Sequence, residues 1–336
     1  MARDADRGIV ACTRVRRVNA QQGPTARVTL SDVAAASGVS RSTVSFVLND
    51  RADQTISAPT RERVLRAARE LGYSPHGIAR ALREGSSRIV VVIVRRGLDT
   101  HYARSFIVGL DAELRRHDHA VLVRHGDEDP AATRELVNTI MPRAVLDIGG
   151  NYLTGRALDD PGGGWRDGLA AHTALQVRYL AERGHTRIAM AFGGIEEAIG
   201  GAGLAGVRLR FARETAASLG LEPILELTLG PPREAAAEQL RAFRAEHPDL
   251  TAIAALDDGA ALRVLAALRD LNVAVPGTIA VIGFDDIGYG ALSDPPLTTV
   301  AIDAEAHGRR AARAALDLDA EAVEPTPGRI VVRESA

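Results

Sequence analysis

One stretch of the sequence has the spacing of a nucleotide-binding loop. Residues 201–206 read Gly-Ala-Gly-Leu-Ala-Gly, which fits GxGxxG, and Glu222 follows at about the distance of a ribose-binding acid. Such a loop needs its first glycine on the turn that leaves a strand. Here residues 193–200 separate Gly201 from the strand-like run that ends at Phe192. A nucleotide-binding α/β enzyme is therefore only a minor alternative.

Other catalytic sets are missing from the sequence. All 41 basic residues other than histidine are arginines, so a phosphate loop with its lysine and a Schiff-base lysine are both excluded. The nine histidines form no HExxH motif, and Cys12 is the single cysteine. The pairs Asp257-Asp258 and Asp285-Asp286 are compatible with an acid pair, with metal ligands or with a ligand-binding cleft. We predict a protein that is not an enzyme, with no catalytic residue, metal or cofactor.

The charge is distributed unevenly along the chain. Residues 1–85 hold 14 arginines and 8 acids, whereas the remainder holds 27 arginines and 35 acids. A basic head on an acidic body is typical of a nucleic-acid-binding head, and a solvated charged tail is the alternative. No apolar run is long enough for a transmembrane helix, and the arginine-rich start does not resemble a secretory signal, so we expect a cytoplasmic protein.

The basic head contains signals for three short helices. Thr29 with Asp32 predicts a capping box, Gly38 a helix end, and Ser40 the cap of a second helix. A third helix is predicted over residues 57–71, with Gly72 as its stop. Two short helices around a glycine turn with a third packed on them are typical of a helix-turn-helix, although a generic three-helix bundle fits the same pattern.

From residue 88 onward, strand-like and helical runs alternate, which predicts parallel sheets with helices on both faces. About 250 residues exceed one such sheet, so two α/β lobes are expected. The predicted strands are Ile89–Val94, Ala120–Val123, Ala144–Ile148, Arg187–Phe192, Ile224–Leu229, Ala252–Leu256 and Ile279–Phe284. The predicted helices lie near 103–116, 131–140, 168–183, 203–219, 233–246 and 258–271. Residues 149–167 are glycine-rich, and no strand is expected there.

Several motifs resemble the lactose-repressor (LacI/GalR) family. In the head these are residues 28–34 (VTLSDVA), 37–49 (SGVSRSTVSFVLN), 60–64 (TRERV), 70–75 (ELGYSP) and 78–82 (IARAL). In the body they are residues 184–189 (GHTRIA), 281–286 (VIGFDD) and 295–300 (PPLTTV). The resemblance implies an all-α helix-turn-helix head on a two-lobed, periplasmic-binding-protein-like α/β body. The expected domains are a disordered tail (1–26), a DNA-binding domain (27–74), a hinge helix and linker (75–87) and an effector-binding and dimerisation domain (88–336).

The resemblance also implies which head residues contact DNA. Arg41, Ser42 and Phe46 match the family's base-reading positions in the major groove. Arg41 can fork onto a guanine, and Phe46 can touch a thymine methyl, although a core position is the alternative for Phe46. Four further residues are expected to contact phosphates or cap helices: Thr29, Ser31, Ser45 and Asn49.

In the hinge, Ala79 and Leu82 lie three residues apart on a short helix. The family inserts such a leucine into the minor groove as a wedge, and a leucine that only caps the linker is the alternative.

In the body, the resemblance places Asp257 at the family's effector-contact aspartate. Leu256 stands where the family usually has asparagine, and Gly203 where it usually has arginine, so a typical sugar site is not expected. Asp285 follows another predicted strand. On the other lobe Asp99, His101 and Tyr102 are candidates for effector contacts, and ordinary loop positions are the alternative. A strand–helix unit of the family also has no counterpart between Ile148 and Gly168.

The function we predict is a transcriptional regulator, most simply a repressor, that reads a near-palindromic double-stranded operator as a homodimer. A small-molecule effector would move the two lobes and melt the hinge helices. The protein would be nucleoid-associated when bound to DNA, with no membrane partner. A solute-binding protein of similar fold is the alternative, opposed by the helix-turn-helix motif.

Overall fold

The computed structural model describes residues 28–48, 56–73, 85–94, 100–126, 130–148, 172–193, 204–324 and 326–336. The chain divides into two compact units, Met1–Arg80 and Ala81–Ala336. The predicted tail and residues 75–84 of the predicted hinge lie outside the described residues, as does the glycine-rich stretch 149–167.

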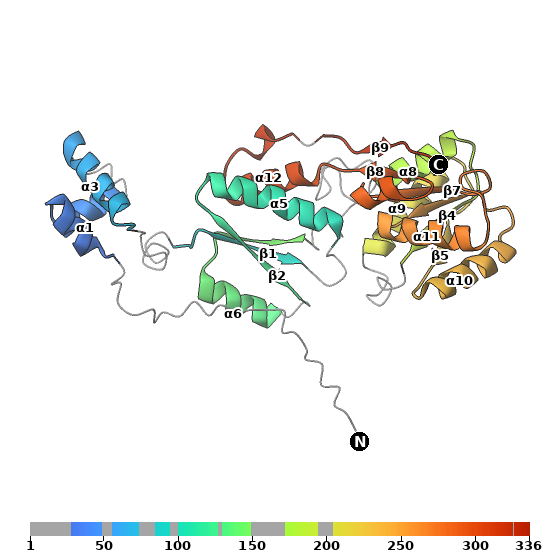
Figure 1. The fold of residues 1–336 in the computed structure, drawn as a ribbon, viewed down its shortest axis with the longest axis horizontal. Coiled ribbons are helices and arrows are strands. Elements are labelled where there is room, and N and C mark those ends of the chain that lie inside the picture. Colours follow the sequence, from blue (N-terminus) through green and yellow to red (C-terminus); the bar gives the residue numbers. More distant parts are fainter. Residues whose placement is uncertain are drawn as a thin grey trace, which may run out of the picture. The chain divides into compact units, whose positions relative to one another are not determined.

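The first unit contains the three helices that the head sequence predicts (Figure 1). The capping box of Thr29 and Asp32 is confirmed, and Gly38 ends the first helix with a φ of 66°, a left-handed conformation that glycine adopts without steric cost. Val33, Val44 and Val64, one from each helix, are fully buried in a common core. The helices are α1 (Leu30–Ser37), α2 (Arg41–Leu48) and α3 (Ala58–Glu70).

The second unit begins with a parallel sheet of strand order β2-β1-β3. The central strand is an uninterrupted apolar run, IVVVIV, as expected for a strand covered on both faces. Figure 1 shows α5 and α12 on one face of this sheet and α6 on the other. The elements are β1 (Ile89–Val94), α5 (His101–Arg116), β2 (Ala120–His125), α6 (Pro130–Ile140), β3 (Ala144–Asp147) and α12 (Ala304–Ala315).

Two glycines let α5 and α12 approach each other closely. A Cβ on Gly109 would lie 2.0 Å from the carbonyl oxygen of Glu305, and one on Gly308 would lie 2.0 Å from that of Phe106. The helices are further joined by Arg313, whose Nη1 donates to Glu113 Oε1 over 2.8 Å. Backbone therefore packs on backbone at this crossing.

The second sheet has six strands in the order β5-β4-β6-β7-β8-β9. Its central strands are buried along their whole length, with α10 and α11 contributing to the apolar cluster on one face and α8 and α9 to the cluster on the other. The strands are β4 (Ile188–Phe192), β5 (Leu225–Thr228), β6 (Ala252–Ala255), β7 (Ala280–Phe284), β8 (Thr298–Ala301) and β9 (Arg329–Val331). The helices are α8 (Thr173–Glu182), α9 (Leu204–Ser218), α10 (Arg233–Glu246) and α11 (Asp258–Asp270).

The predicted parallel sheets are confirmed, and the second sheet carries one antiparallel strand at its edge. Strands β8 and β9 were not predicted, and β9 pairs antiparallel with β8, with Val300 opposite Ile330. Helix α12 was also not predicted, although it covers the first sheet. The seven predicted strands are all present, within one or two residues at their ends.

Candidate nucleic-acid interface

The start of α2 is fixed by a small network of hydroxyl groups. Ser40 Oγ accepts a hydrogen bond from the backbone N–H of Thr43 over 3.1 Å, which is an N-cap. The same oxygen lies 2.7 Å from Ser42 Oγ and 2.8 Å from Thr43 Oγ1. The cap sets the direction of the first turn, and with it the direction of the side chains that this turn carries.

Arg41 and Ser42 occupy that first turn, and both are exposed. Phe46 lies one turn further along α2 and is half-buried. Within the described part of the head, Phe46 is not a member of the apolar cluster that Val44 and Val47 form with the other two helices. Helix α2 thus presents a guanidinium, a hydroxyl and part of an aromatic ring outside the core.

The residues predicted to contact phosphates surround the helix starts. The carboxylate of Asp32 accepts from the backbone N–H and the hydroxyl of Thr29, at 2.7 and 2.8 Å, and these hydrogen bonds lower the pKa of Asp32. Ser31 is exposed in the first turn of α1, and Ser45 is half-buried on α2. Asn49, Ala79 and Leu82 lie outside the described residues, so their predicted roles stay predictions.

The described part of the head is basic overall. It carries five arginines against three acids, which favours attraction to a polyanion. The arginines are Arg41, Arg61, Arg63, Arg66 and Arg69, and the acids are Asp32, Glu62 and Glu70.

In the body, the carboxyl ends of β6 and β7 bring two of the predicted effector residues to one edge of the sheet. Asp257 caps α11, with Oδ1 accepting from the N–H of Ala260 over 2.7 Å. Asp285 follows β7 with a φ of 102°. Burial, together with the nearby carboxylates of Asp257 and Asp258, raises the pKa of Asp285 to about 7, although the guanidinium of Arg208 opposes the rise.

Asp258, which was not singled out as a ligand contact, is fully buried at the same edge. It accepts from Thr299 Oγ1 over 2.5 Å and from the N–H of Ile287 over 2.8 Å. Burial raises its pKa to about 6, against the effect of these hydrogen bonds. Its partners join α11 to β8 and to the segment after β7, which is a structural role.

A buried arginine at this edge was not predicted from the sequence. Arg208 on α9 is 2% exposed, and its Nε donates to Thr173 Oγ1 over 3.0 Å. Its Nη1 donates to the carbonyl of Leu256, and its guanidinium lies 3.5 Å from the centre of the Phe284 ring. Gln176, also fully buried, links this network to the carbonyls of the two strands. A cation with oriented polar neighbours thus lies beside Asp285.

The two described candidates for effector contact on the other lobe, His101 and Tyr102, differ in exposure. His101 is exposed as the first residue of α5, whereas Tyr102 is 2% exposed. The hydroxyl of Tyr102 lies 2.8 Å from Nδ1 of His307 on α12, so it is engaged within the lobe. Asp99 lies outside the described residues. Effector contact by these three residues stays a prediction.

Two features of the described residues bear on metal binding and on membrane insertion. Within the described ranges, no three histidine, cysteine or acidic side chains gather in a way that would hold a metal ion. No helix among the described residues is both long enough and apolar enough to cross a membrane.

Two family models match the chain. Residues 29–76 match "Bacterial regulatory proteins, lacI family", which covers all three helices of the head. Residues 177–336 match "Periplasmic binding protein-like domain", which covers the six-stranded sheet and α12.

Among curated proteins, the chain is similar to the HTH-type transcriptional regulator GalS of Salmonella typhimurium, with 28% identity over 81% of this chain and 84% of GalS. It is 26% identical to the ribose operon repressor of Escherichia coli, over 81% of this chain and 87% of that protein. It is 28% identical to the HTH-type transcriptional regulator CelR of Thermobifida fusca, over 92% of this chain and 98% of CelR.

Solved structures share the fold. The lac repressor dimer bound to operator and the anti-inducer ONPF is 23% identical, with a TM-score of 0.67 and coverage of 92% of this chain and 98% of that chain. The CelR–cellobiose complex is 25% identical, with a TM-score of 0.55 and coverage of 92% and 100%. With the lacI-family head, the binding-protein-like body and these relatives, the chain belongs to the LacI/GalR family of DNA-binding transcriptional regulators.

Proposed function

We propose that this protein represses transcription by binding a near-palindromic operator as a homodimer. The observation that carries the proposal is the exposed pair Arg41 and Ser42 on the first turn of α2, behind the Ser40 cap. The N-terminal residues of the second helix are those that reach base edges in helix-turn-helix proteins. Arg41 would donate to O6 and N7 of a guanine, which is the commonest specific contact in the major groove.

The other DNA contacts complete this reading. Phe46 would touch a thymine methyl, because its ring offers no hydrogen bond. Thr29, Ser31, Ser45 and Asn49 would hold phosphates and so fix the register of the head. Ala79 and Leu82 would enter the minor groove on the hinge, with Leu82 as the wedge that opens a flexible base step.

A second copy of the chain would cover an exposed apolar pair on the body. Tyr289 and Leu292, on the short 3-10 helix Gly288–Leu292, are 73% and 81% exposed. Large apolar side chains exposed on the same short helix are compatible with an interface. The lac repressor of similar fold was solved as a dimer on its operator. A two-fold dimer matches a palindromic operator by symmetry.

The effector would bind at the carboxyl ends of the strands, where open α/β sheets bind ligands. Asp257 and Asp285 would contact it from one lobe, and Asp99, His101 and Tyr102 from the other. A relative of similar fold was solved with cellobiose. Here Leu256 is buried and Gly203 lacks a side chain, so we propose an effector with fewer hydroxyl groups than a common sugar. Its binding would move the lobes and melt the hinge.

We propose a cytoplasmic regulator without enzymatic activity, associated with the nucleoid when bound to DNA. A solute-binding protein of similar fold is the competing function, and the lacI-family head disfavours it.

A mobility-shift assay tests the proposed function. The purified full chain is mixed with duplex fragments from upstream of its own reading frame, in the presence of excess unrelated DNA. We expect retardation of a fragment that contains an inverted repeat, and loss of the discrete complex when the repeat is scrambled. Equal retardation of both fragments would leave only non-specific binding and contradict the proposal.

A further inference from the structure

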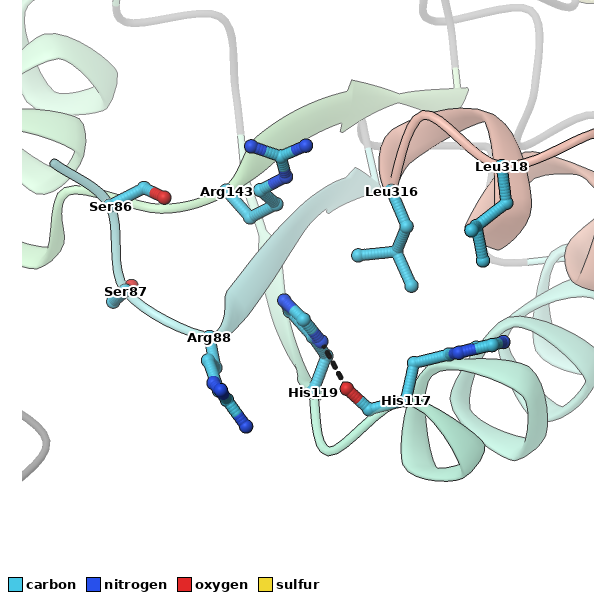
Figure 2. A pocket seen from close by; sticks show the side chains of 8 residues that line it. All are labelled: Ser86, Ser87, Arg88, His117, His119, Arg143, Leu316 and Leu318. Carbon is cyan, nitrogen blue, oxygen red and sulfur yellow. Dashed lines mark hydrogen bonds between the residues drawn. The ribbon is translucent and has the colours of Figure 1, made fainter. Parts of the chain in front are cut away.

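A pocket of about 360 Å³ lies at the amino ends of the strands of the first sheet. The carboxyl end of β1, which precedes His101 and Tyr102 in the chain, lies at the opposite edge of that sheet. Each strand contributes the residue or residues just before it: Arg88 before β1, His119 before β2 and Arg143 before β3. Ser86 and Ser87 complete this side (Figure 2). The pocket is therefore separate from the proposed effector position on the same sheet.

Two helices end at this pocket with the same turn. Asp118 after α5 has a φ of 56°, and Asp317 after α12 has a φ of 57°. In each turn a backbone N–H returns to the helix over 2.9 Å, from His119 to Leu114 and from Leu318 to Arg313. The two residues flanking each aspartate line the pocket, namely His117 and His119 from one helix end and Leu316 and Leu318 from the other.

The lining is cationic and contains no carboxylate. It has two guanidiniums, two imidazoles and two hydroxyls opposite two leucines. Arg88 lies 3.6 Å from the carboxylate of Asp118, and Arg143 pairs with Asp317. Both aspartates are more than 80% exposed, at 86% and 84%. Exposed ion pairs contribute only about 0–1 kcal/mol, so a ligand can replace the aspartates at little cost.

Two polar groups of the lining point to a ligand. The hydroxyl oxygen of Ser87 is buried, and within the described part of the chain it has no hydrogen-bond partner. A buried polar group without a partner is costly, and a bound ligand is one way to satisfy it. Nδ1 of His119 lies 2.6 Å from the carbonyl of His117, which can only accept, so Nδ1 carries the hydrogen. In the neutral ring Nε2 of His119 is then an acceptor, which can receive a hydrogen bond from a hydroxyl group of a ligand.

We propose that this pocket binds a small organic phosphate. The guanidinium of an arginine can donate two parallel hydrogen bonds to the oxygens of a phosphate, and serine hydroxyls supply further donors. The leucines would pack against the organic part, and the volume lies in the range of small-molecule sites. The competing role for these cations is to complement the negative ends of α5 and α12, which needs no ligand.

Calorimetry with the full chain tests the proposal, with glucose 6-phosphate, inorganic phosphate and glucose as probes. We expect glucose 6-phosphate to bind, inorganic phosphate to compete, and glucose alone not to bind at this pocket. Arg88→Gln and Arg143→Gln should each weaken glucose 6-phosphate binding about tenfold or more, because each removes a charge-assisted hydrogen bond. Arg233→Gln is the matched control, since Arg233 on α10 forms an ion pair with Asp270 on α11, away from this pocket.

Ser87→Ala separates a ligand role from a structural one. Because the Ser87 hydroxyl has no partner among the described residues, this variant should keep the melting temperature and lose affinity for glucose 6-phosphate. Three outcomes would overturn the proposal. They are no binding by the wild type, binding unchanged in the variants at positions 87, 88 and 143, and binding lost instead in Asp257→Ala. A fall in stability in the arginine variants without any phosphate binding would assign the cations to the helix ends alone.

Discussion

Ser40 Oγ accepts a hydrogen bond of 3.1 Å from the backbone N–H of Thr43, and this cap determines where α2 begins. The cap places Arg41 and Ser42 on the first helical turn, which is the part of the second helix that reaches base edges in helix-turn-helix proteins. In the proposed mode of DNA binding, the placement of Arg41 and Ser42 therefore depends on a hydroxyl group that has no need to contact DNA itself.

Replacing Arg41 by alanine should cost about 1–3 kcal/mol on the preferred operator and relax the preference at one base pair in each half-site. The reason is the loss of the two hydrogen bonds that Arg41 would donate to O6 and N7 of a guanine. Fluorescence anisotropy with a panel of single-base operator variants measures both effects. Arg63→Ala, an exposed arginine on α3, is the control and should not change the base preference. An unchanged preference in Arg41→Ala would exclude Arg41 as a base reader.

The partly buried carboxyl of Asp285 should make stability fall as the pH rises. Its pKa is about 7 in the folded protein and near 3.8 when exposed, so the folded state binds the proton more tightly. Its contribution is complete below about pH 4 and is lost between about pH 4 and 7. Asp285→Asn cannot ionise, and asparagine tolerates a positive φ. The variant should therefore gain about 1 kcal/mol or more over the wild type between pH 5 and 8.

Urea unfolding of wild type and Asp285→Asn across this pH range measures the difference. Asp258, with a pKa of about 6, contributes in the same direction in both proteins, so the difference between them reports the Asp285 carboxyl together with its repulsion of the Asp258 carboxylate. A difference in unfolding free energy that does not change with pH would show that the carboxyl of Asp285 does not titrate in this window.

The helix crossing between α5 and α12 should not tolerate a methyl group. A Cβ on Gly308 would lie 2.0 Å from the carbonyl oxygen of Phe106, which is backbone and cannot rotate away. Gly308→Ala should therefore destabilise the body by about 1–3 kcal/mol, as overpacking does. Gly288→Ala is the control, because nothing lies within 4 Å of its added Cβ. Equal melting temperatures for the two variants would contradict the close approach.

Common sugars should bind weakly. Each polar group of a sugar that is buried without a hydrogen-bond partner costs about 1–3 kcal/mol, and Leu256 offers no side-chain amide as a partner. Calorimetry with ribose, glucose, lactose and cellobiose should give dissociation constants weaker than about 1 mM, equivalent to about −4 kcal/mol. Micromolar binding that disappears in Asp257→Ala would refute the expected weakness and confirm the location of the effector.

Most helices and strands were predictable because caps, glycine helix ends and apolar runs are signals within a few neighbouring residues. The capping box at Thr29, the glycine at position 38 and the apolar strand runs act over a few residues each. Strand β9 was missed because three residues carry little periodicity, and its pairing with β8 joins positions about thirty residues apart, Val300 and Ile330. The pattern of a strand cannot reveal a partner that lies so far along the chain.

The positions of the proposed DNA-contacting residues were predictable where one helix carries them. Arg41 and Ser42 follow a cap that the sequence displays, and the structure places them on the expected turn. Arg208 was not predictable, because an arginine on a helix is normally solvated. Its burial depends on Thr173, which lies on another helix, and on the carbonyl of Leu256, which lies after another strand. The contact of Tyr102 with His307 spans 205 positions and was missed for the same reason.

Selection from randomised DNA tests the central claim most directly. The full chain is incubated with a pool of random duplexes at physiological salt, and the retained sequences are compared over several rounds. We predict enrichment of one inverted repeat with two equivalent half-sites, each containing a guanine whose preference is lost when the selection is repeated with Arg41→Ala. A pool that stays random, or that converges on a sequence without two-fold symmetry, would contradict a dimer that reads a near-palindromic operator through α2.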